Sequence, residues 1–394
     1  MSKAYIIAGK RTPFVKARAK DPAFPFLHPV DLAAYLVEKT IENIKIKKED
    51  VNDLICGIAH KLGPQGFNPA RLIAIKSLGK NIPGKSIDRL CGSSLEAIID
   101  ASRTIISGDA EIIVACGLED MKNVPIGSDL LPIAYNLQNI WKIISRGPKS
   151  ALESLPEWYE LTPMPNSGEL VAEKYNLTRK ELDEFSLRSQ NNAYLSREKG
   201  CFDSEIISIP TKMGIVDRDD GIRFSTIEGL SKLQPIVKNG KFITAGNSSQ
   251  ITAGSACVII ASESAVKKYN LKPLAEYVAS SVVAVDPKVQ LDGPILAIKK
   301  VLEKANLKLS DIDRFEINEA FASVPIAVIK TLGIDINKVN VYGGAIALGH
   351  PLGASGARLV TTLLNQMKRE NLKYGLATLC IGGGQANAVI MKSC

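Results

Sequence analysis

The sequence lacks the cysteine pattern of a disulfide framework or of a structural zinc site. Its 394 residues include seven cysteines, an odd number, and no two of them form a Cys-x-x-Cys pair. Disulfide-stabilised domains usually have an even number of cysteines, and structural zinc sites need closely spaced ligands. We therefore expect no bound metal and a reducing compartment, and we predict that the protein is cytoplasmic.

Long apolar runs and basic blocks are also missing. No apolar run approaches the roughly 20 residues that a membrane helix needs, and the N-terminus enters a strand-like segment at 4–8 instead of resembling a signal or transit peptide. The net charge of +8 comes from lysines scattered along the chain. Such scattering is typical of a solvated surface, so we predict no membrane span and no nucleic-acid partner. A phosphate-bearing substrate would still gain from the positive charge.

Apolar residues are abundant and follow an alternating pattern. They make up 45% of the sequence, enough for a large core, and the length indicates roughly two to three domains. Strand-like runs alternate with helical patterns, which predicts an α/β fold with helices on both faces of a sheet. The alternating segments are 4–8, 31–42, 53–59, 68–77, 93–107, 111–115, 256–261, 274–284, 294–305, 320–332 and 386–391.

The middle of the chain is less regular. Between 121 and 239, prolines and polar stretches interrupt the pattern, which predicts an inserted loop domain. The second half repeats the first in outline, since in each half a strand ends at a cysteine and a helix-compatible segment follows. We predict an N-terminal half over 1–120, completed by about 245–270, an inserted domain over 121–244, and a C-terminal half over 271–394.

Cys91 and Cys380 have the same kind of local sequence, with an apolar run before the thiol and small residues after it. If 93–107 is a helix, Cys91 lies at its N-terminus, where free N–H groups and the helix dipole lower a thiol pKa and favour a nucleophile. Cys380 precedes three glycines, so backbone N–H groups can point at a developing negative charge. The alternatives are a buried structural cysteine at 91 and a tight strand-to-strand turn after 380.

His350 is one of only three histidines and lies in the glycine-rich run 343–356. The run lacks the Gly-x-Gly-x-x-Gly spacing of a dinucleotide site, so we reject that function. A core histidine bonded to backbone is the alternative, but the glycines and Pro351 favour a loop. Two thiols and an imidazole indicate covalent acyl chemistry.

Two further polar segments are candidates for the site. Asn318 and Glu319 follow a strand and could project into a cleft, although they would serve equally well as helix caps. The segment 244–249, which ends in Ser249, offers several donors to an amide-containing ligand, and by itself it is a polar turn.

Together these segments resemble the thiolase family over nearly the whole chain. The resemblance rests on the Cys91 segment, on 244–249, and on three runs near the C-terminus that hold Asn318-Glu319-Ala320-Phe321, Gly349-His350-Pro351 and Cys380-Ile381-Gly382-Gly383-Gly384. It implies a duplicated five-layer α-β-α-β-α core with a loop domain inserted in the first half. It also implies a homodimer or homotetramer, and a partner subunit of β-oxidation is compatible with it.

The resemblance also implies roles for individual residues. Cys91 would carry the acyl group, His350 would activate it, and Cys380 would exchange a proton with the α-carbon of acetyl-CoA or with the thiol of CoA. Asn318, through a water, would join His350 in one oxyanion hole, while the N–H groups of Cys91 and Gly382 would form another.

Coenzyme A is the co-substrate that the resemblance implies, and it implies no permanently bound cofactor. Ser249 and Arg223 would contact CoA. Several residues depart from the family pattern, and Pro163-Met164-Pro165 replaces a more polar stretch of the acyl pocket. We predict an acyl-CoA C-acyltransferase that cleaves 3-ketoacyl-CoA to acetyl-CoA and a shortened acyl-CoA, or condenses acetyl-CoA in reverse.

Three alternatives remain open at this point. One is an acetoacetyl-CoA-specific acetyl-CoA C-acetyltransferase, and another is a catalytically idle CoA- or lipid-binding homologue. The third is a related ketosynthase, which resembles a Cys-His-His enzyme and has no need of Cys380.

Overall fold

The computed structural model describes residues 3–394 except 18–23, 25–26, 45 and 129–161. Its main strands form one ten-stranded sheet in the order β10-β11-β12-β9-β1-β8-β5-β3-β4, with β2 paired to β8. These strands are β1 (Ala4–Arg11), β2 (Val15–Lys16), β3 (Asp53–Gly57), β4 (Gly84–Ile87), β5 (Ile112–Asp120), β8 (Thr252–Ser262), β9 (Ala275–Ala284), β10 (Arg314–Ile317), β11 (Tyr374–Ile381) and β12 (Gln385–Ser393).

The strand order shows a duplication. In the first half β3 is parallel to β5, β5 is antiparallel to β8, and β8 is antiparallel to β1. In the second half β10 is parallel to β11, β11 is antiparallel to β12, and β12 is antiparallel to β9. The two four-strand series are therefore the same topology used twice, joined where Tyr5 and Ile6 of β1 pair with β9.

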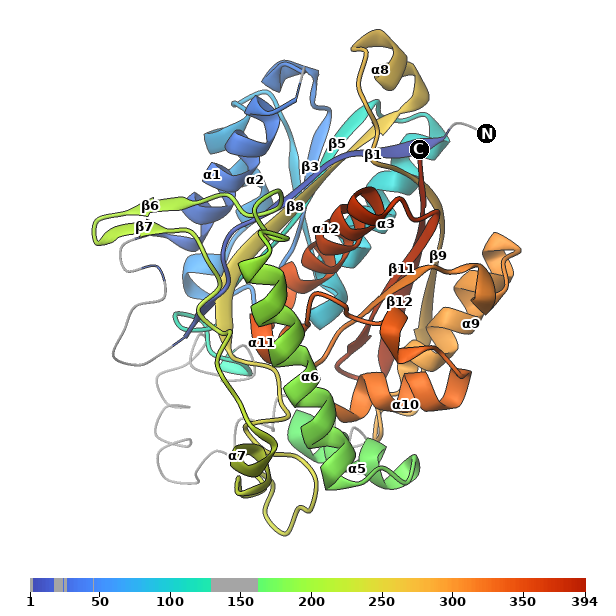
Figure 1. Ribbon diagram of the computed structural model, residues 1–394. Coiled ribbons are helices and arrows are strands. Elements are labelled where there is room, and N and C mark those ends of the chain that lie inside the picture. The colour runs from blue at the N-terminus through green and yellow to red at the C-terminus, as the bar shows by residue number, and fades with distance from the viewer. Residues whose placement is uncertain (1–2, 18–23, 25–26, 45, 129–161) are drawn as a thin grey trace.

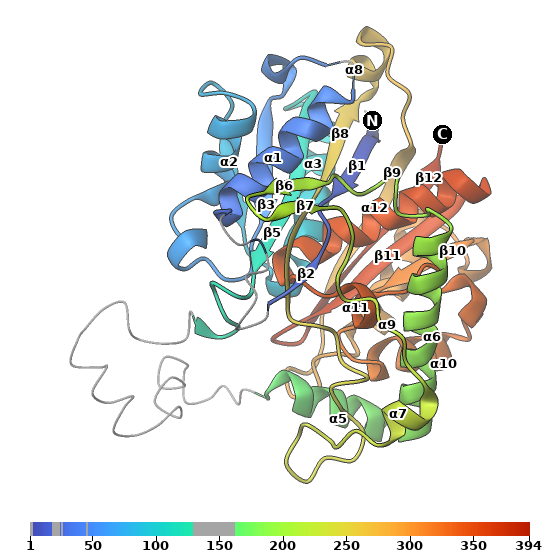
Figure 2. The same ribbon diagram turned by 60° about the vertical axis from the view of Figure 1, so that its left-hand side comes forward.

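The helices form three layers around the two halves of the sheet (Figures 1 and 2). Helices α3 and α12 contact each other and strands of both halves, so they form the central layer. Helices α1 and α2 cover the outer face of the first half, and α9 covers that of the second with α10 beside it. These helices are α1 (Pro29–Glu42), α2 (Pro69–Ser77), α3 (Ser93–Ser107), α9 (Gly293–Ala305), α10 (Ser323–Leu332) and α12 (Leu352–Glu370).

Glycines allow the central helices to pack closely. A Cβ on Gly356 of α12 would lie 2.3 Å from the backbone nitrogen of Leu95 on α3. A Cβ on Gly117 of β5 would lie 2.2 Å from the carbonyl oxygen of Gly353 on α12. Since real Cβ atoms do not approach so closely, the glycine-rich sequence after His350 serves backbone packing in the core.

The duplication places the two cysteines differently from the sequence-based prediction. Cys91 comes just before α3, as predicted, but Cys380 lies inside β11 and is followed by a turn and the antiparallel strand β12. No helix follows Cys380, so that prediction was wrong, because three glycines in succession favour a tight turn over a helix. The counterpart of Cys91 in the second half is His350, which comes just before α12, the counterpart of α3.

The middle segment contains more helix than its irregular sequence predicts. Helix α5 (Met164–Lys174) and the 20-residue helix α6 (Arg179–Glu198) precede the hairpin β6–β7 (Ile209–Thr211 and Gly214–Val216). A short helix α7 (Ile227–Ser231) follows, and α8 (Glu263–Lys268) comes after β8. The prolines at 132, 148 and 156, which supported the loop prediction, lie outside the described residues.

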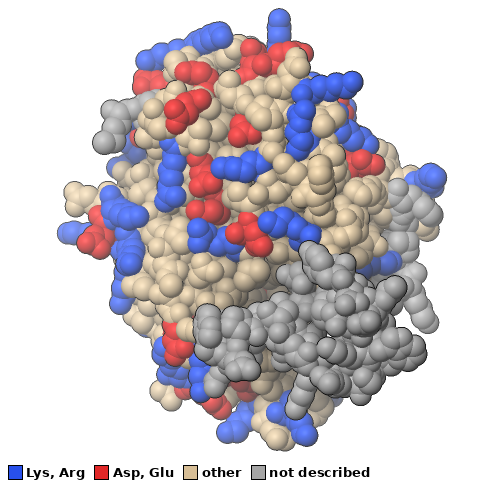
Figure 3. Space-filling model, turned by 180° about the vertical axis from the view of Figure 1, so that it is seen from behind, with Lys and Arg blue, Asp and Glu red and all other residues tan. Residues whose placement is uncertain are grey.

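The described part of the chain contains no helix long and apolar enough to cross a membrane. Figure 3 shows one face of the molecule, where Lys and Arg are interspersed with Asp and Glu. On this face the positive charge is not collected into a continuous patch, in agreement with the scattered lysines of the sequence.

Candidate active site

Cys91 lies in a sharp bend between β4 and α3. The residue before it, Leu90, has a φ of 44°, a conformation that leucine rarely adopts. Three hydrogen bonds hold the bend: Leu90 N donates to Asp88 Oδ1 at 2.7 Å, Arg89 N donates to Ser93 Oγ at 2.9 Å, and Ser93 Oγ donates to the Leu90 carbonyl at 2.6 Å. The bend therefore places the Cys91 thiol at the N-terminus of α3.

The Cys91 thiol is neutral in this setting. Although part of the side chain is accessible, burial raises its pKa to about 11, and the backbone N–H groups of Gly382 and Cys91 lower it by less. The sequence-based expectation of a lowered pKa was therefore wrong, because desolvation exceeds the effect of the helix N-terminus. A neutral thiol needs a base before it can attack, and the interaction with the Gly382 N–H brings residues from both halves together.

Cys380 is buried within an apolar cluster that includes Ile243, Phe321 and Ile346. Burial raises the pKa of its thiol far above the usual value, and the neighbouring Cys91 raises it further. The two predicted catalytic thiols thus lie close enough to influence each other. After Cys380 the chain turns through Gly383 and Gly384, whose φ angles of 76° and 77° favour glycine.

His350 is buried between α11 (Ala345–Leu348) and α12, so its loop lies inside the protein. Its Nδ1 lies 2.5 Å from Ser355 Oγ, which itself donates to the Pro351 carbonyl at 2.8 Å. Since that hydroxyl has only one proton, Nδ1 donates to Ser355 and Nε2 carries the lone pair. Asn318 Nδ2 lies 3.3 Å from Nε2 and donates to it.

Burial, and then the charge of Arg358, lower the pKa of His350 to about 3. The imidazole is therefore neutral at physiological pH and can accept a proton at Nε2. Arg358 is itself buried and pairs with Glu316, with Nη1 and Oε2 3.0 Å apart. This ion pair lies between α12 and β10, the strand that leads to Asn318.

Asn318 and Glu319 do not cap a helix, because α10 begins only at Ser323. Asn318 faces His350, and its Oδ1 is buried without a hydrogen-bond partner among the described residues. Glu319 is bound by Ser189 Oγ at 2.7 Å and Asn340 Nδ2 at 2.8 Å, and it accepts from the Ile346 N–H at 3.1 Å. Glu319 therefore supports the loop before His350, while Asn318 reaches the histidine itself.

The two predicted CoA contacts lie around Gln250, beside the His350 loop. Ser249 is half-buried, and its N–H donates to the Ala320 carbonyl at 2.9 Å. Gln250 accepts at its carbonyl from His350 N at 3.1 Å, and its side-chain amide donates to the Gly221 carbonyl at 3.0 Å. Arg223, two residues after Gly221, is half-buried, and burial lowers its pKa. Ser249 and Arg223 are thus each within two residues of a group that hydrogen-bonds to or through Gln250, which contacts the loop of His350.

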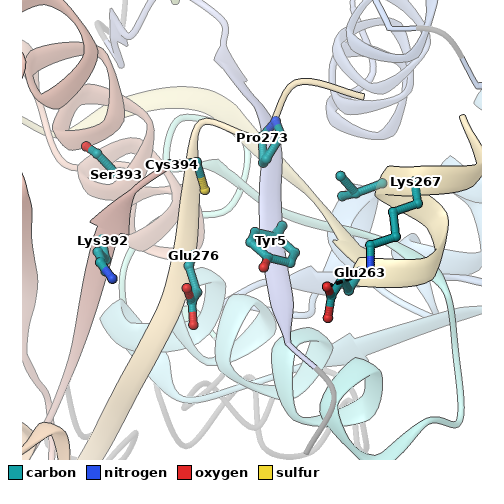
Figure 4. A pocket seen from close by; sticks show the side chains of 9 residues that line it. Tyr5, Glu263, Lys267, Pro273, Glu276, Lys392, Ser393 and Cys394 are labelled. Atoms are coloured by element: carbon teal, nitrogen blue, oxygen red, sulfur yellow. Dashed lines mark ion pairs between the residues drawn. The ribbon is translucent and has the colours of Figure 1, made fainter. Parts of the chain in front are cut away.

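A separate surface pocket of about 390 Å³ lies near the two ends of the chain (Figure 4). The residues that line it are Tyr5, Glu263, Val266, Lys267, Pro273, Glu276, Lys392, Ser393 and Cys394. None of the predicted site residues is among them, so this pocket is not the active site. Within the described residues no cluster of three or more His, Cys, Asp or Glu side chains forms a metal site.

Two family models cover almost the whole chain. The one described as "Thiolase, N-terminal domain" matches residues 4–264, and the one described as "Thiolase, C-terminal domain" matches residues 271–393. The chain belongs to the thiolase family. It is therefore an acyltransferase with the thiolase fold, and its chemistry is CoA-dependent cleavage of 3-ketoacyl-CoA or the reverse condensation.

Individual thiolases are similar over their full length. The steroid 3-ketoacyl-CoA thiolase FadA6 of Mycobacterium tuberculosis is 39% identical, with 100% of this chain and 94% of the relative covered. A beta-ketoadipyl-CoA thiolase of Acinetobacter baylyi is 40% identical, with 100% of both chains covered. The crystal structure of human mitochondrial 3-ketoacyl-CoA thiolase in complex with CoA has a TM-score of 0.89 at 34% identity, covering 100% of this chain and 98% of the other.

Several residues that organise the site have no recognisable signal in the sequence. Ser355, which orients His350, belongs to the glycine-rich run but has no feature that separates it from other serines. Asn387 of β12 donates to the Gly92 carbonyl at 3.1 Å, and Gln290 donates to and accepts from segments far away in the sequence. The partners of Asn387 and Gln290 are distant along the chain, so no local pattern could have identified these two residues.

Proposed function

We propose that Cys91 carries the acyl group in a thiolase reaction that cleaves 3-ketoacyl-CoA. The observation that carries the proposal is the meeting of three groups, the Cys91 thiol, the Gly382 N–H and the Cys380 thiol. A nucleophile, an oxyanion donor and an acid/base group are what thiolytic cleavage of a carbon–carbon bond with an enolate leaving group needs. The neutral His350, oriented by Ser355 and Asn318, supports the role of base.

In the cleavage direction His350 Nε2 takes the proton of Cys91, and the thiolate attacks the 3-keto carbon. The bond between the α-carbon and the keto carbon then breaks, which leaves an acyl-Cys91 thioester and the enolate of acetyl-CoA. Cys380 gives its proton to the α-carbon and regains one from the thiol of incoming CoA. The CoA thiolate attacks the acyl-Cys91 thioester, and the Cys91 thiolate leaves and recovers its proton from His350.

Two sets of donors would stabilise the oxyanions of these steps. The N–H groups of Cys91 and Gly382, both directed at the Cys91 sulfur, would serve the oxygen of the acyl group. Asn318 would hold a water beside His350 for the thioester oxygen of acetyl-CoA. The buried Oδ1 of Asn318, without a partner among the described residues, supports such a water.

Coenzyme A is the co-substrate of this proposal, with no permanently bound cofactor. Ser249 and Arg223 would contact it, because both belong to segments joined to the His350 loop through Gln250. The net charge of +8 favours an anionic, phosphate-bearing ligand. The related human mitochondrial enzyme, 34% identical, has been solved in complex with CoA.

The acyl group would be apolar and of medium length. Cys380 packs among apolar side chains, and the Met164 and Leu90 side chains approach Gly382, where a Cβ would lie 3.8 Å from Met164 Cε and 3.1 Å from Leu90 Cδ1. Of the predicted pocket stretch, Met164 lies by this glycine, while Pro163 is exposed. Burial of each additional methylene contributes roughly 0.8 kcal/mol, or about fourfold in kcat/KM.

Exposed apolar side chains and free cysteines bear on the assembly and the location of the protein. We infer a homodimer or homotetramer, supported by large apolar side chains on the surface such as Phe67 and Phe224, 91% and 92% exposed. A β-oxidation partner subunit is compatible with the same surface. All seven cysteines are free, which supports a reducing compartment such as the cytoplasm.

A thiolysis assay over 3-ketoacyl-CoA substrates of four to twelve carbons tests the proposal. We expect kcat/KM to rise severalfold per carbon beyond acetoacetyl-CoA until the pocket wall is reached. A steep fall beyond four carbons would indicate an acetoacetyl-CoA thiolase instead. Absence of any acyl-enzyme on Cys91 by mass spectrometry, together with tight CoA binding, would indicate a CoA-binding homologue without activity.

A further inference from the structure

Gln290 lies in the loop between β9 and α9 and is fully buried. Its backbone has a φ of 46°, a region that a residue with a long side chain seldom occupies. Its own N–H donates to the Asp286 carbonyl at 2.8 Å, so the unusual conformation is held within the loop. A strained backbone that is kept in place directs the side chain to one location.

The side-chain amide of Gln290 joins two segments of the active site. Its Oε1 accepts from the Gly383 N–H at 2.8 Å, next to the glycine whose N–H addresses Cys91. Its Nε2 donates to the Thr162 carbonyl at 2.8 Å and to Ser167 Oγ at 2.6 Å, at the start of α5. One acceptor and two donors are thus all used in a buried position, where an unsatisfied group is costly.

The turn that Gln290 holds has no large side chain of its own. Gly382, Gly383 and Gly384 follow one another, and the last two have positive φ. On the far side of the turn Val285 N donates to the Gly384 carbonyl at 2.7 Å. Gln290 and Val285 belong to the same loop before α9, so this loop holds the turn at two successive residues.

We propose that Gln290 is a positioning residue that fixes the glycine turn so that the Gly382 N–H faces the oxygen of the acyl-Cys91 thioester. This inference rests on the proposed function of Cys91 and Gly382. The side-chain hydrogen bonds of Gln290 go to Thr162, Ser167 and Gly383, so it acts on the site through the backbone of Gly383. The donor for the oxyanion is a backbone group, so its direction depends on whatever holds the turn.

The amide is the chemical feature that this role requires. Methionine has a similar length but neither donates nor accepts strongly, so it would leave the Gly383 N–H without its partner. Glutamate keeps an acceptor for that N–H but cannot donate to the Thr162 carbonyl when it is ionised. The three side chains therefore separate contact with the glycine turn from contact with the start of α5.

The test compares Gln290→Met with Ser167→Ala. Both substitutions remove contacts of the same buried amide, but only the first removes the contact to the turn. We expect Gln290→Met to lower kcat roughly ten- to a hundredfold, with KM for CoA within about twofold. Ser167→Ala should keep kcat within about twofold and lower Tm by less than Gln290→Met, because it removes one of the three hydrogen bonds of the amide. Gln290→Glu should recover part of kcat, because it retains an acceptor for Gly383.

Acetylation of Cys91 is followed in the same variants by mass spectrometry after rapid mixing with acetyl-CoA. We expect slower acetylation in Gln290→Met than in Ser167→Ala. Equal losses of kcat in the two variants, or an unchanged kcat in Gln290→Met, would overturn the positioning role. If Gln290→Met does not fold, Gln290→Asn takes its place, because its amide is one methylene shorter and no longer reaches the Gly383 N–H. An unchanged kcat in Gln290→Asn, despite a lower Tm, overturns the positioning role, and a loss confined to kcat supports it. Absence of acetyl-Cys91 in the wild type would instead refute the proposed function.

Discussion

Cys91 and Cys380 have similar local sequences but occupy two different structural settings. Cys91 is partly accessible and lies in a strained bend at the start of a helix, while Cys380 is buried in a strand. Burial raises the pKa of both thiols, and for Cys380 the nearby Cys91 adds to the effect. The accessible thiol suits the carrier of a bulky acyl group, and the buried one suits the exchange of a proton.

The two halves of the fold explain this difference. A helix of the central layer begins just after Cys91 in the first half and just after His350 in the second. The duplicated unit therefore has Cys91, the proposed nucleophile, in one copy and His350, the proposed base, at the equivalent position of the other. Cys380 lies near the end of β11. The strand that corresponds to β11 in the first half is β5, and Glu119 lies near its end. The Glu119 carboxylate accepts a hydrogen bond from Gly353 N at 2.8 Å, at the start of α12. The end of β5 therefore holds the central helix in place, whereas the end of β11 carries a thiol.

Removal of the nucleophile should have the largest effect. Cys91→Ala has no thiol to form the acyl-enzyme, so we expect thiolysis to fall by roughly 10⁴-fold or more. Steady-state assays measure the loss, and mass spectrometry after incubation with acetyl-CoA should find no acetylated protein. The wild type should be acetylated at Cys91 alone, and an acetyl group on Cys380 would reverse the two roles.

Replacement of the buried thiol should divide the reaction. In Cys380→Ser the nucleophile Cys91 and the base His350 remain, so acetylation of Cys91 should continue, more slowly because in the proposed mechanism Cys380 also protonates the departing CoA thiolate. Exchange of the α-protons of acetyl-CoA with deuterium and overall turnover should fall by roughly 10²- to 10⁴-fold, the usual contribution of a general acid/base group. A variant that exchanges protons at the normal rate but cannot be acetylated contradicts this assignment.

The buried Arg358 should influence the pH profile. Its charge lowers the pKa of His350, so Arg358→Met should raise that pKa towards its usual range. Protonation of His350 would then begin at higher pH, and the acid limb of kcat/KM should move upwards. Glu316→Gln is the matched control because it keeps the arginine, and it should leave the acid limb in place, since the carboxyl is already protonated in that pH range. Identical profiles in all three proteins would show that Arg358 does not act on His350.

A smaller effect concerns stability. Burial raises the pKa of Glu316 to about 7, above its value in an unfolded chain. The protonated form is therefore favoured by folding, a contribution that is fully present below the unfolded pKa and is lost as pH rises through about 7. Glu316→Gln lacks this titration, so the Tm of the wild type relative to the variant should decline by a few degrees between pH 5 and pH 8. Parallel Tm curves would show that the carboxyl stays ionised throughout.

Several elements could be predicted from the sequence almost to the residue, but helices α5, α6 and α12 were not predicted. The helix predicted over 93–107 is observed as Ser93–Ser107, and the strand predicted over 274–284 is observed as Ala275–Ala284. Such segments depend on a 3.6- or 2-residue periodicity of apolar side chains, which is a property of neighbouring residues. The same holds for the short motifs around Cys91, His350 and Cys380, whose resemblance to thiolases the family matches confirm.

Packing of distant segments determines how these motifs meet and what surrounds them. The sequence alone determined the α/β order and the thiolase motifs, and it indicated a repeat whose equivalent positions were assigned wrongly to the two cysteines. It did not determine the protonation of Cys91, because burial raises the pKa of the thiol and the cluster it packs against includes Leu352 of the second half. Nor did it reveal Gln290, whose partners Thr162, Ser167 and Gly383 are 93 to 128 positions away. Burial and hydrogen bonds between distant segments are set by packing, which no local pattern encodes.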